Sequence, residues 1–397
     1  MRAGRALRMG RRHISRVVQS TSAVDPGAAL FNSYDGSYSD SPRVLSEALA
    51  VGGATQRYWV AQHDAAGLPS DVRGVEPGTQ RYARTLGRAG LVIANTYMSE
   101  SFHKRDGVSY LQTWHGTPLK RIGWDNPQWD RSGPGFRWMT NDVAKWTYLL
   151  SQSSYCTQAL RSAFRFDGEV LELGYPRNDV LNSAASAQIR HRLRKQLGAS
   201  EHVSVTLWTP TWRDDSLSSA RPDHHFPLDF ERVHQALGND HILLLRLHRN
   251  VSALRPELPS SVIDVSSYPD ISELYLAADV LMTDYSSTMF DFAVTSKPQI
   301  FYMWDLARYR DIVRGFYFDI VEEAPGPIVR TTDEVIKAIH EATSERSTYA
   351  GAYDAFRQKY CPVDDGDATR RILSALGAQP SSRASESGKA GTDVRHS

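Results

Sequence analysis

Short apolar runs separated by longer polar or amphipathic stretches recur along most of this chain. Three of the runs, 90–95, 242–247 and 279–283, have the length and composition of buried strands. Strands that alternate with helices at this spacing form a parallel sheet with helices on its faces. With 41% hydrophobic and 23% charged residues, the composition is that of a globular protein. The sequence therefore predicts an α/β fold and excludes a coiled coil, a collagen and a mostly disordered chain.

The alternating pattern occurs twice, once on each side of residues 174–179 (GYPRND), which have the composition of a turn. Strands are expected at 28–33, 57–61, 90–95, 108–113, 169–173, 202–208, 242–247, 261–265, 279–283 and 298–302. Helices are expected at 42–50, 79–88, 136–164, 183–197, 229–237, 270–277, 287–295 and 332–345. A length of 397 residues also fits two domains of ordinary size.

We therefore predict two doubly wound domains, 26–182 and 183–376, with a basic arm at 1–25 and a disordered tail at 377–397. The tail is rich in Ser, Gly and charged residues and has no aromatic residue, which is typical of a solvated segment. In doubly wound folds, ligands bind outside the carboxyl ends of the strands. We expect the two domains to face each other across a cleft lined by the loops that follow these strand ends.

The first 20 residues contain six arginines and no acidic residue. Without them, 40 basic residues stand against 45 acidic ones, so the arm is attached to a mildly acidic body. On a helix the arm would place these apolar residues roughly on one side: Ala3, Leu7, Ile14, Val17 and Val18. Such a helix could bind an anionic membrane surface. A transit peptide and an unstructured chain start are the alternative interpretations.

The sequence also limits where the protein works and what it binds. No apolar run approaches the 18 residues of a spanning helix, which excludes an integral membrane protein. Cys156 and Cys361 are too few for a disulfide framework and fit a reducing compartment. The balance of 46 basic and 45 acidic residues argues against nucleic-acid binding. We expect a cytoplasmic protein, with the arm as a means of attachment to the inner face of the cell membrane.

Chemically useful side chains follow four of the predicted strands. His115 comes two residues after the strand at 108–113 and precedes Gly116, which leaves room for a substrate. An imidazole with an ordinary pKa near 6.5 can accept a proton at neutral pH. Thr211 and Arg213 follow the strand at 202–208 and offer a hydroxyl and a guanidinium, groups that bind phosphate.

The other two segments are 245–250, which contains His248, and 283–291, which contains Ser286 and Ser287. Hydroxyls between a strand and a helix can bind phosphate together with the free N–H groups of the helix. Each segment also has a structural interpretation, because single histidines near strand ends are usually structural and serines often cap helices. Four such segments after four strands favour one shared site.

Six segments of the chain stand out when they are read together: LQTWHGTPLKRIG, GYPRND, TPTWRD, LRLH, SELYLAADVLMTDYSSTMFDFAVTSKPQIFY and RGFYFDIVEEAPGPIV. In this order they resemble the CDP-glycerol glycerophosphotransferases of bacterial cell-wall and capsule synthesis. The resemblance covers about residues 28–375. It implies a GT-B fold of two Rossmann-type domains that transfers glycerol phosphate from CDP-glycerol to a hydroxyl of a teichoic acid or glycan acceptor, releasing CMP. Related members transfer ribitol phosphate.

The resemblance also implies a role for individual residues. His115 matches the general base that deprotonates the acceptor hydroxyl, and His248 matches a histidine at the donor phosphates. The residues implied in substrate binding are Gly116, Thr117, Thr211, Arg213, Arg249, Thr283, Ser286 and Ser287. Asp284 and Asp291 would be structural. Arg249 is a departure, because family members usually have proline after the second histidine, and it leaves the detail of that subsite open.

The expected partners are CDP-glycerol or CDP-ribitol and a lipid-linked or polymeric glycan acceptor. We expect no cofactor and no metal, because the chain has no Asp-x-Asp motif, and Asp214 and Asp215 are adjacent and poorly spaced for one. Histidine, arginine and backbone N–H groups can neutralise the charge of a transferring phosphoryl group. Three alternative functions stay open: ribitol phosphate transfer, transfer from a UDP- or GDP-sugar, and a membrane-associated scaffold without activity.

Overall fold

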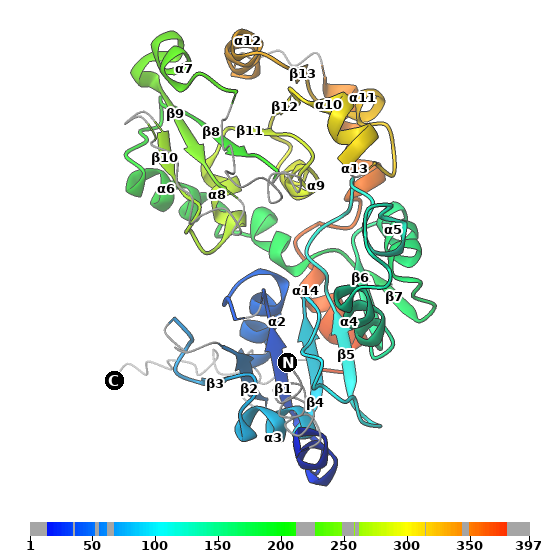
Figure 1. The fold of residues 1–397 in the computed structure, drawn as a ribbon. Helices are drawn as coiled ribbons and strands as arrows, with labels where there is room; N and C mark the ends of the chain where they lie inside the picture. The colour runs from blue at the N-terminus through cyan, green and yellow to red at the C-terminus, as the bar shows by residue number, and fades with distance from the viewer. Residues whose placement is uncertain are drawn as a thin grey trace, which may run out of the picture.

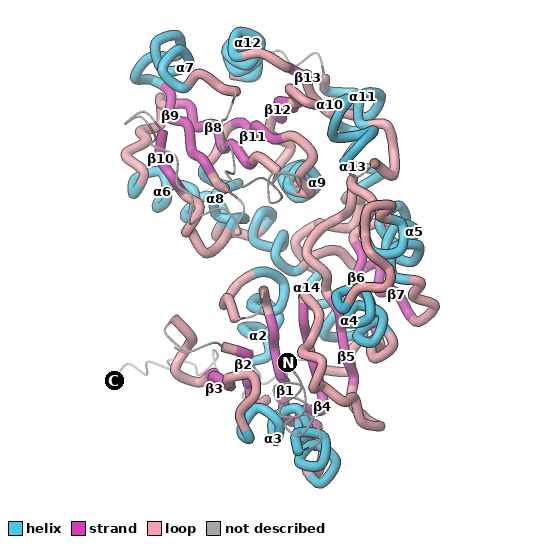
Figure 2. The backbone as a smooth tube through the Cα atoms, viewed as in Figure 1, coloured by secondary structure: helices cyan, strands magenta, loops and turns pink. Residues whose placement is uncertain are grey.

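The computed structural model describes residues 14–34, 36–51, 55–61, 67–211, 227–247, 258, 262–313, 315–343 and 349–378. Within these ranges the chain forms two parallel sheets, each flanked by helices (Figures 1 and 2). The α/β class predicted from the sequence is confirmed. Residues 1–13 of the arm and the tail beyond Ala378 lie outside the described residues.

The first unit is built on a sheet with the strand order β3-β2-β1-β4-β5-β6-β7. Its strands are β1 (Asp25–Asn32), β2 (Gln56–Val60), β3 (Val72–Val75), β4 (Ala89–Ala94), β5 (Ser109–Gln112), β6 (Tyr148–Ser151) and β7 (Glu169–Glu172). Its helices are α2 (Asp40–Val51), α3 (Gln80–Arg88), η1 (Gly123–Asp125), α4 (Pro134–Val143) and α5 (Ser154–Phe164). The order changes direction between β1 and β4, which is where open parallel sheets bind ligands.

The second unit follows a short 3₁₀ helix, η2 (Pro176–Asn182), and has the strand order β10-β9-β8-β11-β12-β13. Its strands are β8 (Ser204–Thr209), β9 (His241–Leu245), β10 (Val262–Asp264), β11 (Val280–Thr283), β12 (Gln299–Tyr302) and β13 (Ile328–Val329). Its helices are α6 (Ser186–Gln196), α7 (Phe230–Leu237), α8 (Ile271–Ala277), α9 (Thr288–Ala293), α10 (Leu306–Arg308), α11 (Ile320–Glu323) and α12 (Thr332–Ala342). Here the order changes direction between β8 and β11.

All ten predicted strands are present, with ends that differ by a few residues. The continuous helical region predicted at 136–164 is wrong, because β6 separates α4 from α5. The β6 run is only four residues long, and periodicity cannot distinguish so short an apolar run from helix. The short strands β3 and β13 and the last two helices, α13 (Ala350–Tyr360) and α14 (Ala368–Ala375), were not predicted.

The two units exchange packing elements. Ala368, Ile372 and Leu373 of α14 belong to the hydrophobic core of the first unit, although the predicted boundary placed them in the second domain. Figure 1 shows this red helix beside the cyan strands of the first sheet. Leu119 of the first unit packs in the core of the second, and its carbonyl accepts a hydrogen bond from Tyr317 at 2.9 Å. The loop after β5, which contains Leu119, is therefore held against the second unit.

Candidate active site at the carboxyl ends of the two sheets

His115 lies three residues after β5, at the carboxyl end of the first sheet. Its Nδ1 is 2.7 Å from the backbone oxygen of Asn95, the residue that follows β4. A carbonyl oxygen only accepts hydrogen bonds, so Nδ1 carries the proton and Nε2 keeps its lone pair. The ring of Trp114 stacks on the imidazole at a centroid distance of 4.1 Å. This tautomer suits a base that accepts a proton at Nε2.

The surroundings of His115 also favour the neutral ring. Burial lowers the pKa of His115 below its ordinary value of 6.5, and the charges of Arg177 and Lys120 act in the same direction. The hydrogen bond to Asn95 and the carboxylate of Asp40 oppose this effect without cancelling it. At neutral pH the imidazole is therefore unprotonated, which is the state that a general base requires.

Gly116 is a point of contact between the two units. Its φ is +150°, and a Cβ added there would lie 2.6 Å from the Oγ of Ser287 and 2.9 Å from its Cβ. Only glycine fits this position without displacing Ser287 of the second unit. Two of the predicted site segments, one from each sheet, are thus brought together by the fold.

Ser286 and Ser287 lie between β11 and α9 and are both partly exposed. The Oγ of Ser286 accepts a hydrogen bond from the N–H of Thr288 at 3.4 Å, whereas the Ser287 side chain makes no capping bond. Because α9 is only six residues long, the serine hydroxyls are the main groups that this segment offers to a ligand.

Thr283 and Thr211 lie in the same part of the second unit but make contacts within the protein. Thr283 is fully buried, and its hydroxyl donates to the backbone oxygen of Thr209 at 2.9 Å. The N–H of Thr211 donates to Oδ1 of Asp284 at 2.9 Å. This bond joins the loops after β8 and β11 and agrees with the structural role expected for Asp284. Substrate contacts by the two threonines stay predictions.

Thr117 is fully buried beside the loop of His115. Its hydroxyl donates to Oε1 of Gln152 at 2.5 Å, and the amide of Gln152 donates to Asp364. Asp364 also accepts the N–H of Tyr175 at 2.8 Å, and burial raises the pKa of this aspartate to about 7. The position of Thr117 indicates a structural link between the loop and the connecting segment, and its predicted contact with substrate gains no support.

Three predicted site residues, Arg213, His248 and Arg249, lie outside the described residues. The strands that lead to them, β8 and β9, are parallel neighbours, and β8 also pairs with β11. Their carboxyl ends therefore share one edge of the sheet with the segment that contains Ser286 and Ser287. The roles of the three residues stay predictions.

Sequence reasoning missed Arg177, which it placed in a turn. This arginine lies on η2, is almost fully buried, and forms ion pairs with Asp40 of the first unit and Asp291 of the second, each at 3.0 Å. An arginine that follows β7 and the turn residues Gly-Tyr-Pro was a signal that could have been followed. Nothing in the sequence pairs it with either aspartate, because the three residues are more than 100 positions apart.

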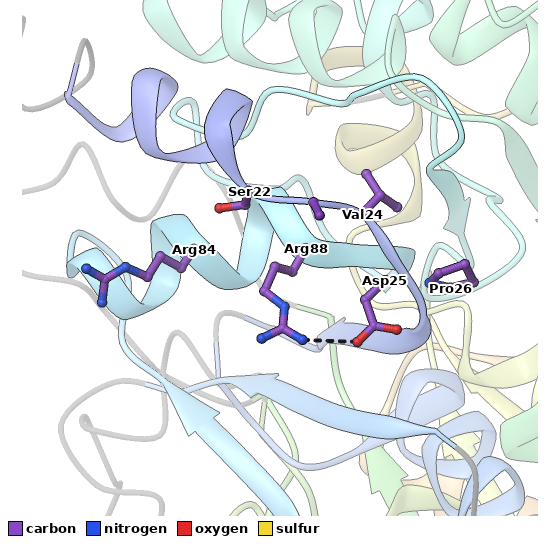
Figure 3. Close-up of a pocket in the computed structure, with 7 residues that line it drawn as sticks. Ser22, Val24, Asp25, Pro26, Arg84 and Arg88 are labelled. Atoms are coloured by element: carbon purple, nitrogen blue, oxygen red, sulfur yellow. Dashed lines mark hydrogen bonds and ion pairs between the residues drawn. The ribbon is translucent and has the colours of Figure 1, made fainter.

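A pocket of about 390 Å³ lies at the other end of the first sheet (Figure 3). It is lined by Asp25 at the amino end of β1 and by Arg84 and Arg88 of α3, and Arg88 pairs with Asp25 at 3.1 Å. Because His115 follows the carboxyl end of a parallel strand, this pocket lies away from the candidate site. In the part of the chain that the structure describes, no three His, Cys, Asp or Glu side chains are grouped to hold a metal ion.

Comparison with known proteins decides the family. The model of the CDP-glycerol:poly(glycerophosphate) glycerophosphotransferases matches residues 14–377. The chain belongs to this family. The resemblance inferred from the sequence motifs is thereby confirmed, and with it the expectation of a CDP-glycerol glycerophosphotransferase.

Relatives of this glycerophosphotransferase include transferases and polymerases. A teichoic acid glycerol-phosphate transferase of Staphylococcus aureus (strain NCTC 8325 / PS 47) is 36% identical over 87% of this chain and 92% of its own length. A teichoic acid poly(glycerol phosphate) polymerase of Bacillus subtilis (strain 168) is 33% identical over 87% of this chain. The chain spans only about half of that polymerase, 48% of its length.

Solved structures show the same fold. The wall teichoic acid polymerase TagF aligns over 92% of both chains with a TM-score of 0.84 and 31% identity. A UDP-N-acetylglucosamine 2-epimerase from Listeria monocytogenes aligns over 89% of this chain with a TM-score of 0.51 and 13% identity, which is a likeness of fold alone.

Proposed function

We propose that this glycerophosphotransferase moves glycerol phosphate from CDP-glycerol to a hydroxyl of a teichoic acid or related glycan acceptor and releases CMP. The observation that carries the proposal is the family match, which runs through both units from residue 14 to 377. The S. aureus relative, a teichoic acid glycerol-phosphate transferase, supports it along nearly its whole length. The two sheets are then the Rossmann-type units of a GT-B fold, in support of which each strand order changes direction once.

In the proposed reaction, Nε2 of His115 accepts the proton of the acceptor hydroxyl. The hydroxyl oxygen attacks the β-phosphorus of CDP-glycerol, a new O–P bond forms, and the bond from the β-phosphorus to the bridging oxygen breaks. The bridging oxygen leaves with CMP. Such transfers depend on positioning and on neutralisation of charge rather than on covalent catalysis by the protein. The fixed tautomer and lowered pKa of His115 support its role as the base.

On the donor side, we propose that the hydroxyls of Ser286 and Ser287 hold the pyrophosphate. Their partial exposure, and the contact between Ser287 and Gly116 beside the proposed base, support this assignment. Arg213, His248 and Arg249 would supply positive charge to the same phosphates, as the family resemblance implies.

The proposed function is tested by mass spectrometry of the products formed from CDP-glycerol and CDP-ribitol with lipid-linked and soluble glycan acceptors. We expect glycerol phosphate to be added and CMP to be released, with CDP-glycerol the better donor. A ribitol-phosphate polymerase of Bacillus spizizenii (strain ATCC 23059 / NRRL B-14472 / W23) is 31% identical over only 68% of this chain, less than the glycerol-type relatives cover. Transfer from CDP-ribitol alone would favour the alternative, and transfer from neither would refute the proposal.

We expect the transfer not to require a divalent metal, because cationic side chains and backbone N–H groups can neutralise the developing charge. The measurement is CMP release from CDP-glycerol with and without EDTA. The rate should be the same in both. Loss of activity with EDTA that Mg²⁺ restores would contradict this prediction.

The basic arm is proposed to attach the enzyme to anionic membrane at the cytoplasmic face. Residues 14–20 are helical, with Ile14 and Val17 57% and 47% exposed, and no helix among the described ranges is long and apolar enough to cross a membrane. Gln19 anchors this helix to the body through the carbonyl of Ser101 at 2.8 Å and the N–H of His103 at 2.9 Å. The exposed apolar residues therefore lie on the helix that contains Arg16, and the other five arginines of the arm precede this helix in the sequence.

Deletion of residues 2–13 removes five of the six arginines and leaves the anchor at Gln19 in place. Each arginine near an anionic surface contributes about 1 kcal/mol, so we expect the deletion to abolish flotation with phosphatidylglycerol vesicles. Vesicles of phosphatidylcholine serve as the control, and added salt should weaken binding of the intact chain. Unchanged flotation after the deletion would discard the membrane proposal.

A further inference from the structure

Arg177 joins three segments of the chain through one buried guanidinium. It lies on η2, and its side chain is 5% exposed. Nη1 donates to Oδ1 of Asp40, at the start of α2 in the first unit, at 3.0 Å. Nε and Nη2 donate to the two carboxylate oxygens of Asp291, on α9 of the second unit, at 3.2 and 3.0 Å. The pairing therefore holds only where both units are docked on the connecting segment.

Tyr34 links this ionic group to His115. Its hydroxyl donates to Oδ2 of Asp40 at 2.9 Å, and its N–H donates to Oδ1 of Asn95 at 3.0 Å. The ring of Tyr34 lies 5.7 Å from the imidazole, and Asn95 accepts the Nδ1–H of His115 through its backbone oxygen. Tyr34 thus contacts both the imidazole and Asn95, while its hydroxyl is bonded to Asp40, which pairs with Arg177.

The backbone around His115 is held in an uncommon conformation. Tyr34, Asp40 and Trp114 have φ values of +45°, +61° and +52°. Among the described residues, only Arg165 and Ser296 share positive φ without being glycine. L-residues seldom adopt this region, and such strain gathers where a functional geometry is fixed by its surroundings. Three of the five are Tyr34 and Asp40 of this network and Trp114, which stacks on the imidazole.

The network also places opposite charges near His115. The carboxylate of Asp40 favours the protonated imidazole, whereas the guanidinium of Arg177 disfavours it. Lys120 also disfavours protonation of the ring, while Tyr34 packs against the ring as a neutral phenol. Removal of the Asp40 charge should therefore lower the pKa of His115, and removal of the Arg177 charge should raise it.

We propose that Tyr34, Asp40 and Arg177 are positioning residues that orient His115 and couple it to α9 of the second unit. The inference rests on the proposed role of His115 as the base. The segment before α9 contains Ser287, which packs against Gly116 next to the base. Docking of the two units therefore fixes the positions of both the base and the proposed donor-binding hydroxyls.

The test is an NMR titration of the full-length protein, without substrate, with ¹³C at the histidine Cε1 and His115→Gln to assign the signal. In Asp40→Asn the midpoint of His115 should fall by roughly 0.5 pH or more, and in Arg177→Gln it should rise by a similar amount. The matched controls are Asp367→Asn and Arg370→Gln, which break an exposed ion pair near α14 and should leave the midpoint unchanged. Shifts in the same direction, or none, would overturn the inference.

A variant that keeps the ionic group provides a second measurement if Arg177→Gln does not fold. Tyr34→Phe retains the ring and removes only the hydroxyl bonded to Asp40. We expect kcat for CMP release to fall on the order of tenfold, with KM for CDP-glycerol unchanged, because a misplaced base slows the chemical step and not donor binding. Wild-type kcat in this variant would remove Tyr34 from the network.

The same variants separate this inference from the proposed function. If the midpoints shift in opposite directions and the acid limb of kcat/KM shifts with them, both stand. If the midpoints shift and the acid limb does not, the positioning network stands and His115 is not the base. If the midpoints do not shift, the network fails, and the role of the base is still decided by the His115 variants themselves.

Discussion

Replacement of His115 by alanine is expected to lower kcat/KM for CMP release by at least ~100-fold, the lower range for loss of general acid–base catalysis. The physical reason is the tautomer: Nδ1–H is bound to Asn95, so Nε2 is the basic atom, and burial keeps the pKa of the ring below 6.5. The acid limb of kcat/KM should therefore lie below pH 6.5 in the wild type. In the variant this limb should disappear with the imidazole.

The control for this prediction is His191→Ala, which removes a histidine that is 75% exposed on α6. It should keep wild-type kcat/KM and the wild-type pH dependence. His248→Ala is expected to lose at least ~100-fold as well, because the family resemblance places this residue at the donor phosphates. Activity of His115→Ala close to that of the control would remove His115 from the mechanism.

Replacement of Arg177 by methionine is expected to destabilise the protein by about 3–5 kcal/mol. The methionine fills similar space but leaves the carboxylates of Asp40 and Asp291 without their shared cation, and both are nearly buried. For units of this size the loss corresponds to a fall in Tm of roughly 10 °C. Differential scanning calorimetry measures it. Arg370→Met, which breaks an exposed pair with Asp367, is the matched control and should leave Tm unchanged.

The loss of stability in Arg177→Met should depend on pH, and the pKa of Asp40 determines the direction of this dependence. Burial alone would raise this pKa, but Arg177, the N–H of Ser41 and the hydroxyl of Tyr34 together hold it below the ordinary value of 3.8. In the wild type the ionised carboxylate of Asp40 stabilises the fold fully above the pKa that this group has in the unfolded chain. This stabilisation is lost as the pH falls through the lower pKa of the folded protein. Without the guanidinium, burial raises the pKa and the folded variant takes up a proton. The difference in Tm should be largest near neutral pH and shrink as the pH falls toward about 4.

Most of the secondary structure could be predicted because it depends on local pattern. The runs at 90–95 and 279–283 are apolar enough to be strands whatever surrounds them, and both were found. The wrong predictions concern segments whose structure depends on the elements that they contact in the fold. Tyr148–Ser151 is a strand because it pairs with β5 and β7, and α14 is assigned to the first unit because its apolar face packs in that core. Neither partner is visible in the local sequence.

The site was predicted in the same partial way. The motifs identified His115 and the Ser286–Ser287 segment, and the fold places them on either side of the contact at Gly116. Thr117 was grouped with them because the family resemblance runs through the segment that contains it, yet its side chain is buried against Gln152. Proximity in sequence gives no information about which way a side chain in a loop is directed.

The sequence by itself determined the family, the two-sheet architecture and the identity of the proposed base, because each depends on residues that are adjacent or regularly spaced. Only the tertiary structure decided which nitrogen of His115 is basic, since that depends on the carbonyl of Asn95. It alone brought Asp40, Arg177 and Asp291 together from three distant parts of the chain. Charges interact through space, and their distances are set only when the sheets and the connecting segment have folded against one another.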